Sequence, residues 1–357
     1  MIQTLTITHF RNHSASRIRT GGCANIIITG PNGGGKTSIL EAISILSGNG
    51  GLRGATPAEM ARDGAAAATG VNVEMADGAE IAVSFSAGEP KKKAKINNDA
   101  APLSKLGQVM RMVWVTPRED RVFIDAASDR RAFFDRLASG FISNHAGHVF
   151  RLSKLLSERA FALKSGASDI WLLPLERQIS EIATRVAHDR AHFIRGINRF
   201  LADVNTAATL TGMLEEKIAG GADVPDLTVE YADYLSKNRV LVADKSSIDG
   251  PHRADFGLFD GNLGRRAEQI STGQQKAALL RLIIAYAKLV RENSSAPVIV
   301  LLDEIAAHLD THARQVLFLE LQAAGAQVWM TGLDAASFSD VPNAKFIYCE
   351  NGAIQLN

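Results

Sequence analysis

The order of apolar and polar residues along the chain predicts both strands and helices. Residues 25–29 and 298–302 are short, nearly continuous apolar runs, which are typical of strands buried in a parallel sheet. Residues 71–75 and 80–85 alternate with a period of two across an Asp77-Gly78 turn, which predicts an antiparallel hairpin. After residues 38 and 276 apolar residues recur at helical spacing, and there we expect helices.

The middle of the chain has helical periodicity over a long stretch. We expect helices at 128–150, 152–165 and 175–204, with Trp171-Leu172-Leu173-Pro174 as a connection between the second and the third. A long coiled coil would need hundreds of heptad residues, and this stretch is far shorter. We therefore predict a small helical bundle.

Composition and charge narrow the class of protein. The 357 residues suffice for two or three domains, and 39 Lys and Arg against 38 Asp and Glu give a formal net charge of +1. Affinity for nucleic acid must then come from local patches, and the densest is Lys91-Lys92-Lys93-Ala94-Lys95, which either contacts a phosphate backbone or is a solvated turn. With Cys23 and Cys349 as the only cysteines, no signal peptide and no apolar run of about 20 residues, we expect a soluble cytoplasmic protein without a membrane partner.

The most specific motif is a phosphate-binding loop. The run Gly30-Pro31-Asn32-Gly33-Gly34-Gly35-Lys36-Thr37 fits G-x-x-x-x-G-K-[ST], with Ser38 next, and it joins the predicted strand 25–29 to a helix. Backbone N–H groups of the loop and the positive end of the helix can then surround a polyphosphate, with Lys36 neutralising it. The alternative is a glycine turn with an accidental lysine.

Two acids end the other buried strand. Asp303 and Glu304 follow residues 298–302, at the end of a parallel strand where α/β sheets bind their ligands. Asp303, with the hydroxyl of Thr37, is suited to Mg²⁺, and Glu304 to polarising a water that attacks the γ-phosphate. Ordinary surface acids are the alternative, which the phosphate loop disfavours.

A third element precedes that strand. Ser271-Thr272-Gly273-Gln274-Gln275 lies at the start of a predicted helix and offers a hydroxyl, a small backbone and a positive helix end to an anion. Taken alone, it is equally well an ordinary helix cap. Asp310 closes a further short motif, Ala306-Ala307-His308-Leu309-Asp310.

The order of these motifs resembles that of the ABC-type ATPases and, within them, the RecF family, the SMC-like DNA-repair ATPases of bacteria. The resemblance rests on blocks spread through most of the chain: Leu5-Thr6-Ile7-Thr8-His9-Phe10-Arg11-Asn12-His13, Glu41-Ala42-Ile43, Thr116-Pro117-Arg118-Glu119-Asp120, Ser128-Asp129-Arg130-Arg131-Ala132-Phe133-Phe134-Asp135 and Gly250-Pro251-His252-Arg253-Ala254-Asp255.

The resemblance implies an α/β fold with an ABC-type P-loop NTPase head, built from a parallel sheet core and an antiparallel β arm. The gap from Lys36 to Gly273 is too long for a compact nucleotide-binding domain. We therefore assign residues 1–117 and 223–357 to the head and 118–222 to an inserted α-helical lever domain.

The resemblance also implies a slow, DNA-linked ATPase with ATP and Mg²⁺. Glu304 and Lys36 are the expected catalytic residues, and Thr37 and Asp303 the metal ligands. The expected nucleotide-binding residues are Gly30, Pro31, Asn32, Gly33, Gly34, Gly35, Lys36, Thr37, Ser38, Arg11, Ser271, Gly273, Gln274 and Asp310.

By the same resemblance, Ser271 and Gly273 cap the γ-phosphate of ATP held by a second subunit, and Asp310 aligns that interface. The expected partners are a second copy of the chain in an ATP-dependent homodimer, double-stranded DNA with gaps or junctions gripped through its backbone, and a RecR-type mediator protein. The expected role is recombinational repair and replication-fork maintenance, assisting RecR and RecO in recombinase loading.

The chain departs from the ABC pattern near one strand. Gly332 stands where transporter-type members have a histidine, and Thr331 is a partial substitute. Arg11 either reaches the phosphates or is an exposed edge arginine. Arg130 and Arg131 either contact DNA or pair with Asp129 and Asp135; we expect pairing for one of them and leave the other open. His252 and Arg253 are interpreted as a structural turn.

Three other functions compete. A transporter subunit is disfavoured by the long insert and the missing histidine. An ATP-dependent nuclease head would need an acidic cluster beyond Asp303 and Glu304, and a scaffold that never hydrolyses ATP is disfavoured by Glu304.

Overall fold

Two compact units make up the chain. The computed structural model describes residues 1–48, 50–64, 67–86, 88–89, 91–239, 248–304 and 311–356. One unit comprises Met1–Asp120 and Tyr286–Asn357, and the other comprises Arg121–Ala285. The second unit thus begins close to the expected limit of residue 118 but continues well past residue 222.

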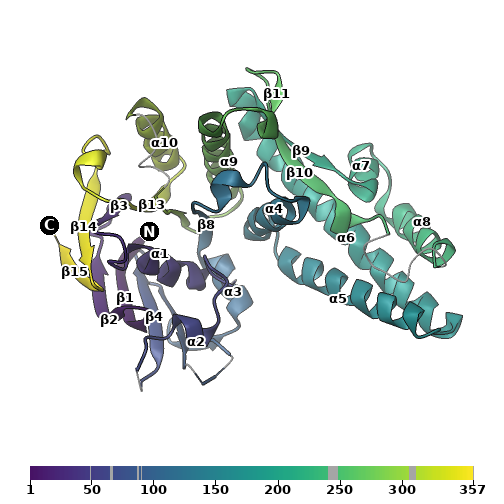
Figure 1. Ribbon diagram of the computed structural model, residues 1–357, viewed down its shortest axis with the longest axis horizontal. Coiled ribbons are helices and arrows are strands. Elements are labelled where there is room, and N and C mark those ends of the chain that lie inside the picture. Colours follow the sequence, from purple (N-terminus) through teal and green to yellow (C-terminus); the bar gives the residue numbers. More distant parts are fainter. Residues whose placement is uncertain are drawn as a thin grey trace. The chain divides into compact units, whose positions relative to one another are not determined.

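A six-stranded, mostly parallel sheet forms the centre of the first unit (Figure 1). Its strands, in spatial order, are β15 (Ala353–Leu356), β14 (Ala344–Glu350), β3 (Asn25–Thr29), β13 (Ala326–Thr331), β12 (Val298–Leu302) and β8 (Arg111–Val115). Every residue of β3, β12 and β13 is buried, because both faces of the sheet are covered. The two strands predicted from apolar runs are therefore confirmed, and β13 lies between them with parallel pairing on each side.

A second, antiparallel sheet completes the first unit. Its strands, in spatial order, are β2 (His13–Arg19), β1 (Ile2–Phe10), β4 (Thr69–Met75), β5 (Glu80–Phe85), β6 (Lys93–Ile96) and β7 (Asp99–Ala101). The predicted hairpin is confirmed, since Val71 of β4 pairs with Val83 of β5.

Helix α1 (Lys36–Ser44) lies between the two sheets and shares one core with both. Its Ile39 and Ile43 pack in the same cluster as Leu5 of the antiparallel sheet and Ile28 of the parallel sheet. The other helical segments of this unit are η1 (Ile45–Ser47), α2 (Pro57–Met60), α3 (Leu103–Val109), η2 (Glu119–Arg121, whose last residue belongs to the second unit), α10 (Thr311–Ala323) and η8 (Ala336–Phe338). Burying α1 on two sides fixes the loop before it.

The second unit is built on three long helices. They are α4 (Ala127–Phe141), α5 (His145–Lys164) and α6 (Asp169–Leu201), followed by α7 (Met213–Ala219) and α8 (Val224–Lys237). α9 (Thr272–Asn293) begins in this unit and continues into the first.

The predicted helix limits were wrong at two places. The first break is at Asn144, not near residue 151, because Asn144 adopts the left-handed conformation (φ 66°) that asparagine tolerates well. Residues 171–174 are not a connection but lie inside α6, which begins at Asp169. Pro174 removes a single helical N–H there, and Arg239 bonds to Asp169 and Glu176, on either side of the proline.

A small sheet extends the second unit beyond the predicted helices. Strand β9 (Thr206–Thr211) pairs with β10 (Asp255–Asp260), which pairs with β11 (Arg265–Arg266). This pairing joins the chain after residue 222 to the helices, which accounts for the later limit of the unit. The remaining short helices are η3 (Ala202–Val204), η5 (Pro251–Arg253) and η6 (Ala267–Gln269).

The second unit has a charged core where α4, α5 and α6 meet. Arg190 bonds to both carboxylate oxygens of Asp135 at 2.8 Å and to Glu215 at 3.1 Å, and buried His145 lies between Asp135 (3.1 Å) and Asp189 (3.2 Å). Burial alone would lower the pKa of His145, but its two carboxylate partners outweigh burial and raise it. Burial alone would raise the pKa of Asp135, but Arg190 and His145 lower it to about 2.

Of the two arginines for which pairing within the helix was considered, Arg130 has a different partner. Arg130 bonds to both oxygens of Asp255, at 2.8 and 2.6 Å, instead of pairing with Asp129 or Asp135 within its own helix. Asp135 is already held by Arg190, so sequence neighbours alone gave the wrong partner.

Candidate nucleotide-binding site

The loop from Gly30 to Gly35 follows the buried end of β3 and leads into α1. Gly30 has φ 141°, and a Cβ there would overlap the carbonyl oxygen of Cys349 on β14. Cys349 also approaches from its side chain, where Sγ lies 3.2 Å from the carbonyl oxygen of Gly34. Burial raises the pKa of the Cys349 thiol to about 11, so it remains protonated and donates this bond. Packing against β14 therefore requires glycine at the start of the loop.

The end of the loop presents its N–H groups without competition from a capping side chain. Gly35, at the N-cap of α1, has φ 109° and offers no side-chain oxygen to the first turn. Its carbonyl oxygen lies 3.1 Å from Nε2 of His13, a buried side chain whose pKa burial lowers. Lys36 is 5% exposed, and its ammonium donates to the carbonyl oxygens of Gly30 (2.7 Å) and Pro31 (2.9 Å). These groups form a concave, positively charged site that is suited to phosphate oxygens.

Four residues join the loop to the acidic end of β12. The Thr37 hydroxyl donates to Oδ1 of Asp303 at 3.0 Å, and the Thr331 hydroxyl donates to the same oxygen at 2.7 Å. Thr331 also accepts a hydrogen bond from the backbone N–H of Glu304 at 3.0 Å. Glu304 has φ 59°, a left-handed conformation that costs about 1 kcal/mol for a residue with a Cβ, and this bond holds it there.

The parallel sheet brings these residues together. Because β13 lies between β3 and β12, the last residues of all three strands meet at one edge of the sheet. Thr331 occupies the last position of β13, beside the place where the family pattern has a histidine. From the sequence we expect Thr331 only to substitute in part for that histidine, whereas its bonds to Asp303 and Glu304 depend on the fold.

The donor set fits Mg²⁺. Thr37 and Asp303 supply a hydroxyl and a carboxylate within hydrogen-bond distance, and Mg²⁺ with a nucleotide usually takes one or two such protein ligands, phosphate oxygens and waters. Within the described ranges, no three His, Cys, Asp or Glu side chains form a metal-binding group.

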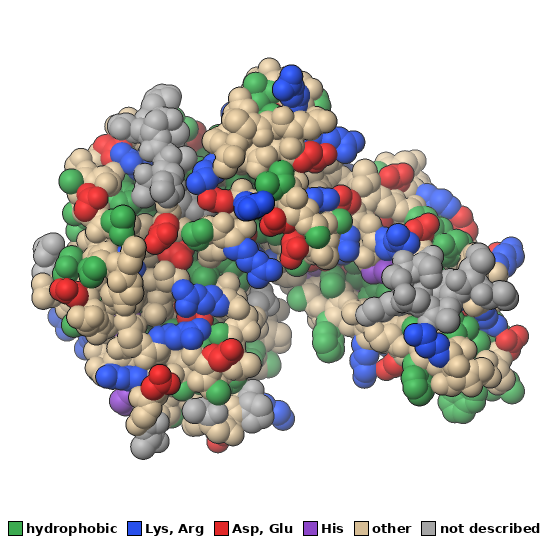
Figure 2. Space-filling view, in the orientation of Figure 1, with side chains coloured by type: hydrophobic (Ala, Val, Ile, Leu, Met, Phe, Trp, Pro, Cys, Tyr) green, Lys and Arg blue, Asp and Glu red, His purple; other side chains and the backbone are tan. Residues whose placement is uncertain are grey.

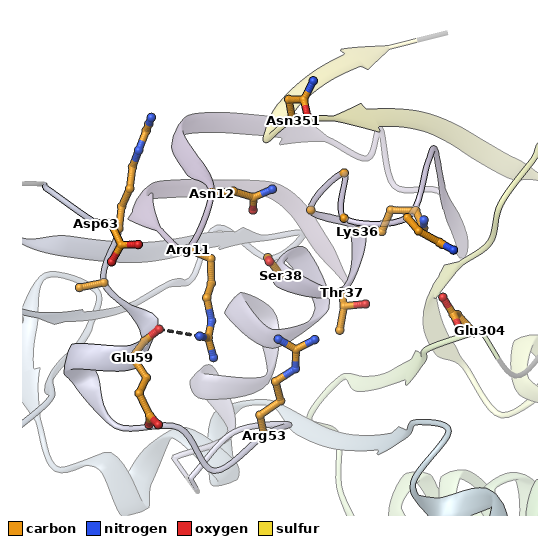
Figure 3. A pocket seen from close by; sticks show the side chains of 16 residues that line it. Arg11, Asn12, Lys36, Thr37, Ser38, Arg53, Glu59, Asp63, Glu304 and Asn351 are labelled. Carbon is orange, nitrogen blue, oxygen red and sulfur yellow. Dashed lines mark hydrogen bonds between the residues drawn. The ribbon is translucent and has the colours of Figure 1, made fainter.

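A cavity of about 810 Å³ opens over the loop (Figure 3). Asn32, Gly33, Gly34, Gly35, Lys36, Thr37 and Ser38 line it together with Glu304, Arg11, Asn12, Arg53, Glu59, Ala61, Arg62, Asp63 and Asn351. Its volume is in the range of small-molecule sites. Gly30 and Pro31 shape the loop from behind through the carbonyl groups that hold Lys36.

Arg11 faces this cavity but is held by an acid. Its guanidinium bonds to both oxygens of buried Glu41 at 3.0 and 2.7 Å and to the Glu59 carbonyl oxygen at 2.6 Å. The hydrogen bond to Glu41 raises the pKa of Arg11. Arg11 is thus positioned beside the loop, and Arg53, which the sequence analysis did not single out, adds a half-exposed guanidinium 3.7 Å from Glu41. The only sequence signal for Arg53 was its place shortly after the loop helix.

The predicted signature lies in the second unit. Ser271, Gly273 and Gln274 are exposed at the start of α9, where the Ser271 hydroxyl lies 3.1 Å from Oε1 of Gln274. The structure therefore does not place these residues relative to the loop. Asp310 lies outside the described residues.

The lysines of residues 91–95 differ in how exposed they are. Lys93 and Lys95 are exposed on β6, and Lys93 lies 3.1 Å from Glu89. Burial lowers the pKa of Lys92. Figure 2 shows further Lys and Arg side chains over the part of the first unit where Figure 1 has α1 and α2. A DNA contact by residues 91–95 stays a prediction.

Residues 1–355 match the family described as "RecF/RecN/SMC N terminal domain". The chain is 34% identical to the "DNA replication and repair protein RecF" of Caulobacter vibrioides over 94% of this chain and 92% of that protein. The fold is similar to two solved structures of "the recombination mediator protein RecF" in the "RecFOR pathway". The one described as RecF-ATPrS has a TM-score of 0.85 at 21% identity, covering 100% of this chain and 98% of that one. The one described as RecF-ATP has a TM-score of 0.83 at 21% identity, covering 100% and 99%.

None of the helices in the described part of the chain has the length and apolar character of a membrane span.

Proposed function

The chain belongs to the RecF family of DNA replication and repair proteins, and from this membership and the geometry of the site we propose that it is an ATP-dependent recombination mediator that acts on DNA. One observation carries the ATP-dependent part of this proposal. The 3.0 Å bond between Thr37 and Asp303 joins the start of the loop helix to the acidic end of β12 in one site. A glycine turn with an accidental lysine would have no reason to meet a second acidic motif more than two hundred residues away.

The loop would hold ATP through backbone N–H groups of residues 33–37, while Lys36 exchanges its loop carbonyl partners for the β- and γ-phosphates. Thr37 and Asp303 would hold Mg²⁺, which neutralises charge on the phosphates. Arg11, positioned by Glu41, lines the same cavity and adds positive charge near the nucleotide.

Glu304 is the residue suited to hydrolysis. It lines the cavity next to Thr37, and its carboxylate would orient a water and accept its proton as the water attacks the γ-phosphate (Figure 3). The Thr331 bond to its backbone N–H holds it on this side of the strand. We expect slow turnover, as in a switch rather than a motor.

ATP would join two copies of the chain. Ser271, Gly273 and Gln274 are exposed at the positive start of α9, where they are accessible to a nucleotide bound by another subunit. A γ-phosphate shared by two subunits gives the closed dimer an affinity that ADP cannot supply, and hydrolysis then releases it. Family membership supports Asp310 as a residue of that interface.

DNA and mediator proteins are the partners that follow from the family. The relatives are DNA replication and repair proteins, and the similar structures are described as part of a RecFOR pathway. We propose that the dimer grips gapped or junction DNA through its backbone and assists RecR and RecO in recombinase loading.

The test is the molecular mass in solution of the wild type, Glu304→Gln and Lys36→Ala, each with and without ATP and Mg²⁺. We expect a dimer only with ATP, more persistent in Glu304→Gln because hydrolysis is blocked, and absent in Lys36→Ala. A monomer under every condition would remove the role of Ser271 and Gly273 across a dimer. An unchanged affinity of Lys36→Ala for ATP would remove the loop as the binding site.

A further inference from the structure

The second unit contains a cavity of about 720 Å³ that is separate from the nucleotide site. It lies between the start of α4, the middle of α5 and the short helix η5. Its polar lining comprises Ser128, Arg131 and Asp135 of α4, Ser153 of α5, Arg190 of α6, and His252 and Arg253 of η5. The opposite wall is apolar and comes from α5, with Val149, Leu152 and Leu156.

Two sequence blocks that resemble the family meet at this cavity. Arg131 comes from the block 128–135, and His252 and Arg253 come from the block 250–255. The pair between Arg130 and Asp255 and the bond from Arg131 to the Ala254 carbonyl oxygen (2.8 Å) hold the blocks together. The turn before η5 is tightly packed too, since a Cβ on Gly250 would overlap the hydroxyl of Tyr231.

The cationic groups of the cavity differ in how their charge is balanced. Arg190 contributes to the wall, but Asp135 and Glu215 already bind it. Arg131 donates to a neutral carbonyl oxygen, and no carboxylate in the described part of the chain forms an ion pair with it. Arg253 has one acidic neighbour, Asp249, at 3.7 Å, with both side chains at least half exposed, so that pair is weak.

The cavity therefore contains two arginines without a close carboxylate partner: Arg131 bonds to a carbonyl oxygen, and the pair of Arg253 with Asp249 is weak. Burial, first, and the neighbouring Arg190 lower the pKa of Arg131 by more than Asp255 and Asp135 raise it, so Arg131 lies in a net positive surrounding. A bound anion would relieve this repulsion. Guanidinium groups bind phosphate with two parallel hydrogen bonds, and the serine hydroxyls can donate to further oxygens.

We propose that this cavity binds a phosphate monoester attached to a nucleoside, presented either by the end of a DNA strand or by a free nucleotide. A monoester carries close to two negative charges at neutral pH, which matches the two unbalanced arginines, whereas a phosphate inside a strand carries one. The volume suits a mononucleotide, and the apolar wall of α5 offers a surface to the sugar and base. This assignment rests on the proposed action on DNA and gives His252 and Arg253 a ligand beyond their place in a turn.

The test measures fluorescence anisotropy of labelled DNA on the full chain, with a non-hydrolysable ATP analogue saturating the first site. The probes are duplexes that differ only in carrying terminal phosphates or terminal hydroxyls, and dCMP is the free competitor. We expect the phosphorylated duplex to bind at least about tenfold more tightly, and Arg131→Gln and Arg253→Gln each to abolish this preference. Arg151→Gln is the matched control, because Arg151 is an exposed arginine of α5 outside the cavity.

Displacement of the duplex by dCMP, lost in the Arg253→Gln variant, would assign the site to free nucleotides as well. Equal binding of both duplexes together with no binding of dCMP would overturn the proposal, as would a preference that survives in both cavity variants. Binding of the ATP analogue is measured on the same samples. Its absence would refute the proposed function, whereas its presence without any phosphate preference would refute the second site alone. Arg253 is half exposed, so its substitution leaves the fold intact, which thermal unfolding checks.

Discussion

Replacing Thr331 by valine tests most directly how Asp303 and Glu304 are held at the end of β12. Valine has nearly the shape of threonine, so the change removes the hydroxyl and leaves the packing. That hydroxyl is fully buried and makes two bonds, one to Oδ1 of Asp303 (2.7 Å) and one from the N–H of Glu304 (3.0 Å).

The expected loss follows from these bonds. A hydrogen bond to a charged group contributes about 1.5–3 kcal/mol and a neutral one about 1 kcal/mol. Thr37 still bonds to Asp303 in the variant, so we take the lower end and expect the free energy of unfolding to fall by about 2.5 kcal/mol. Thr331→Ser keeps the hydroxyl and loses a methyl group, which should lower the free energy of unfolding by about 1 kcal/mol.

Urea unfolding followed by tryptophan fluorescence reports on the first unit, which contains Thr331. Of the three tryptophans, Trp114 and Trp329 are buried in the first unit, whereas Trp171 is 75% exposed and lies in the second. ATP hydrolysis by Thr331→Val should fall more than ATP affinity, because the variant frees the backbone of Glu304 while leaving Lys36 and the loop in place. If the valine variant unfolds at the same urea concentration as wild type, or the serine variant is equally destabilised, the reasoning is wrong.

Four further predictions concern the charged core and the loop. Because the folded-state pKa of His145 is raised, its contribution to stability is complete below about pH 6.5 and is lost as pH rises through the folded pKa; the pH dependence of urea unfolding should lose this slope in His145→Gln. Asp135, with a pKa of about 2, contributes stability above about pH 4 that is lost as pH falls towards 2, and Asp135→Asn should show no such loss in acid unfolding. Gly30→Ala should abolish ATP binding measured by calorimetry, because its Cβ meets a backbone carbonyl. Gly33→Ala has open space at the Cβ but φ 76°, so it adds about 1–2 kcal/mol of backbone strain without an overlap and should bind ATP better than Gly30→Ala; the opposite order would refute the packing argument. Lys36→Ala should weaken ATP binding by about 10- to 100-fold in the same assay, and an unchanged affinity would contradict its role.

Local sequence patterns determined much of the first unit. The apolar runs at 25–29 and 298–302 are buried strands, and the alternation across Asp77-Gly78 is a hairpin, because each pattern matches the period of its own backbone. The phosphate loop was predicted because its glycines and its lysine are consecutive in the chain. The break between α4 and α5 was missed because a single asparagine can leave the helical conformation without a strong compositional signal.

Only the tertiary structure decided which distant residues meet. Asp303 and Thr37 could be paired from motif order, but the bond of Thr331 to both acids depends on β13 lying between β3 and β12. Likewise, Arg130 binds Asp255 rather than a neighbour on its own helix, because β10 and α4 pack together in the folded unit. The sequence by itself determined the local elements and the chemistry of the loop, since these depend on neighbouring residues. The partners of the buried charges depend on strand order and helix packing, which bring together residues that no local pattern connects.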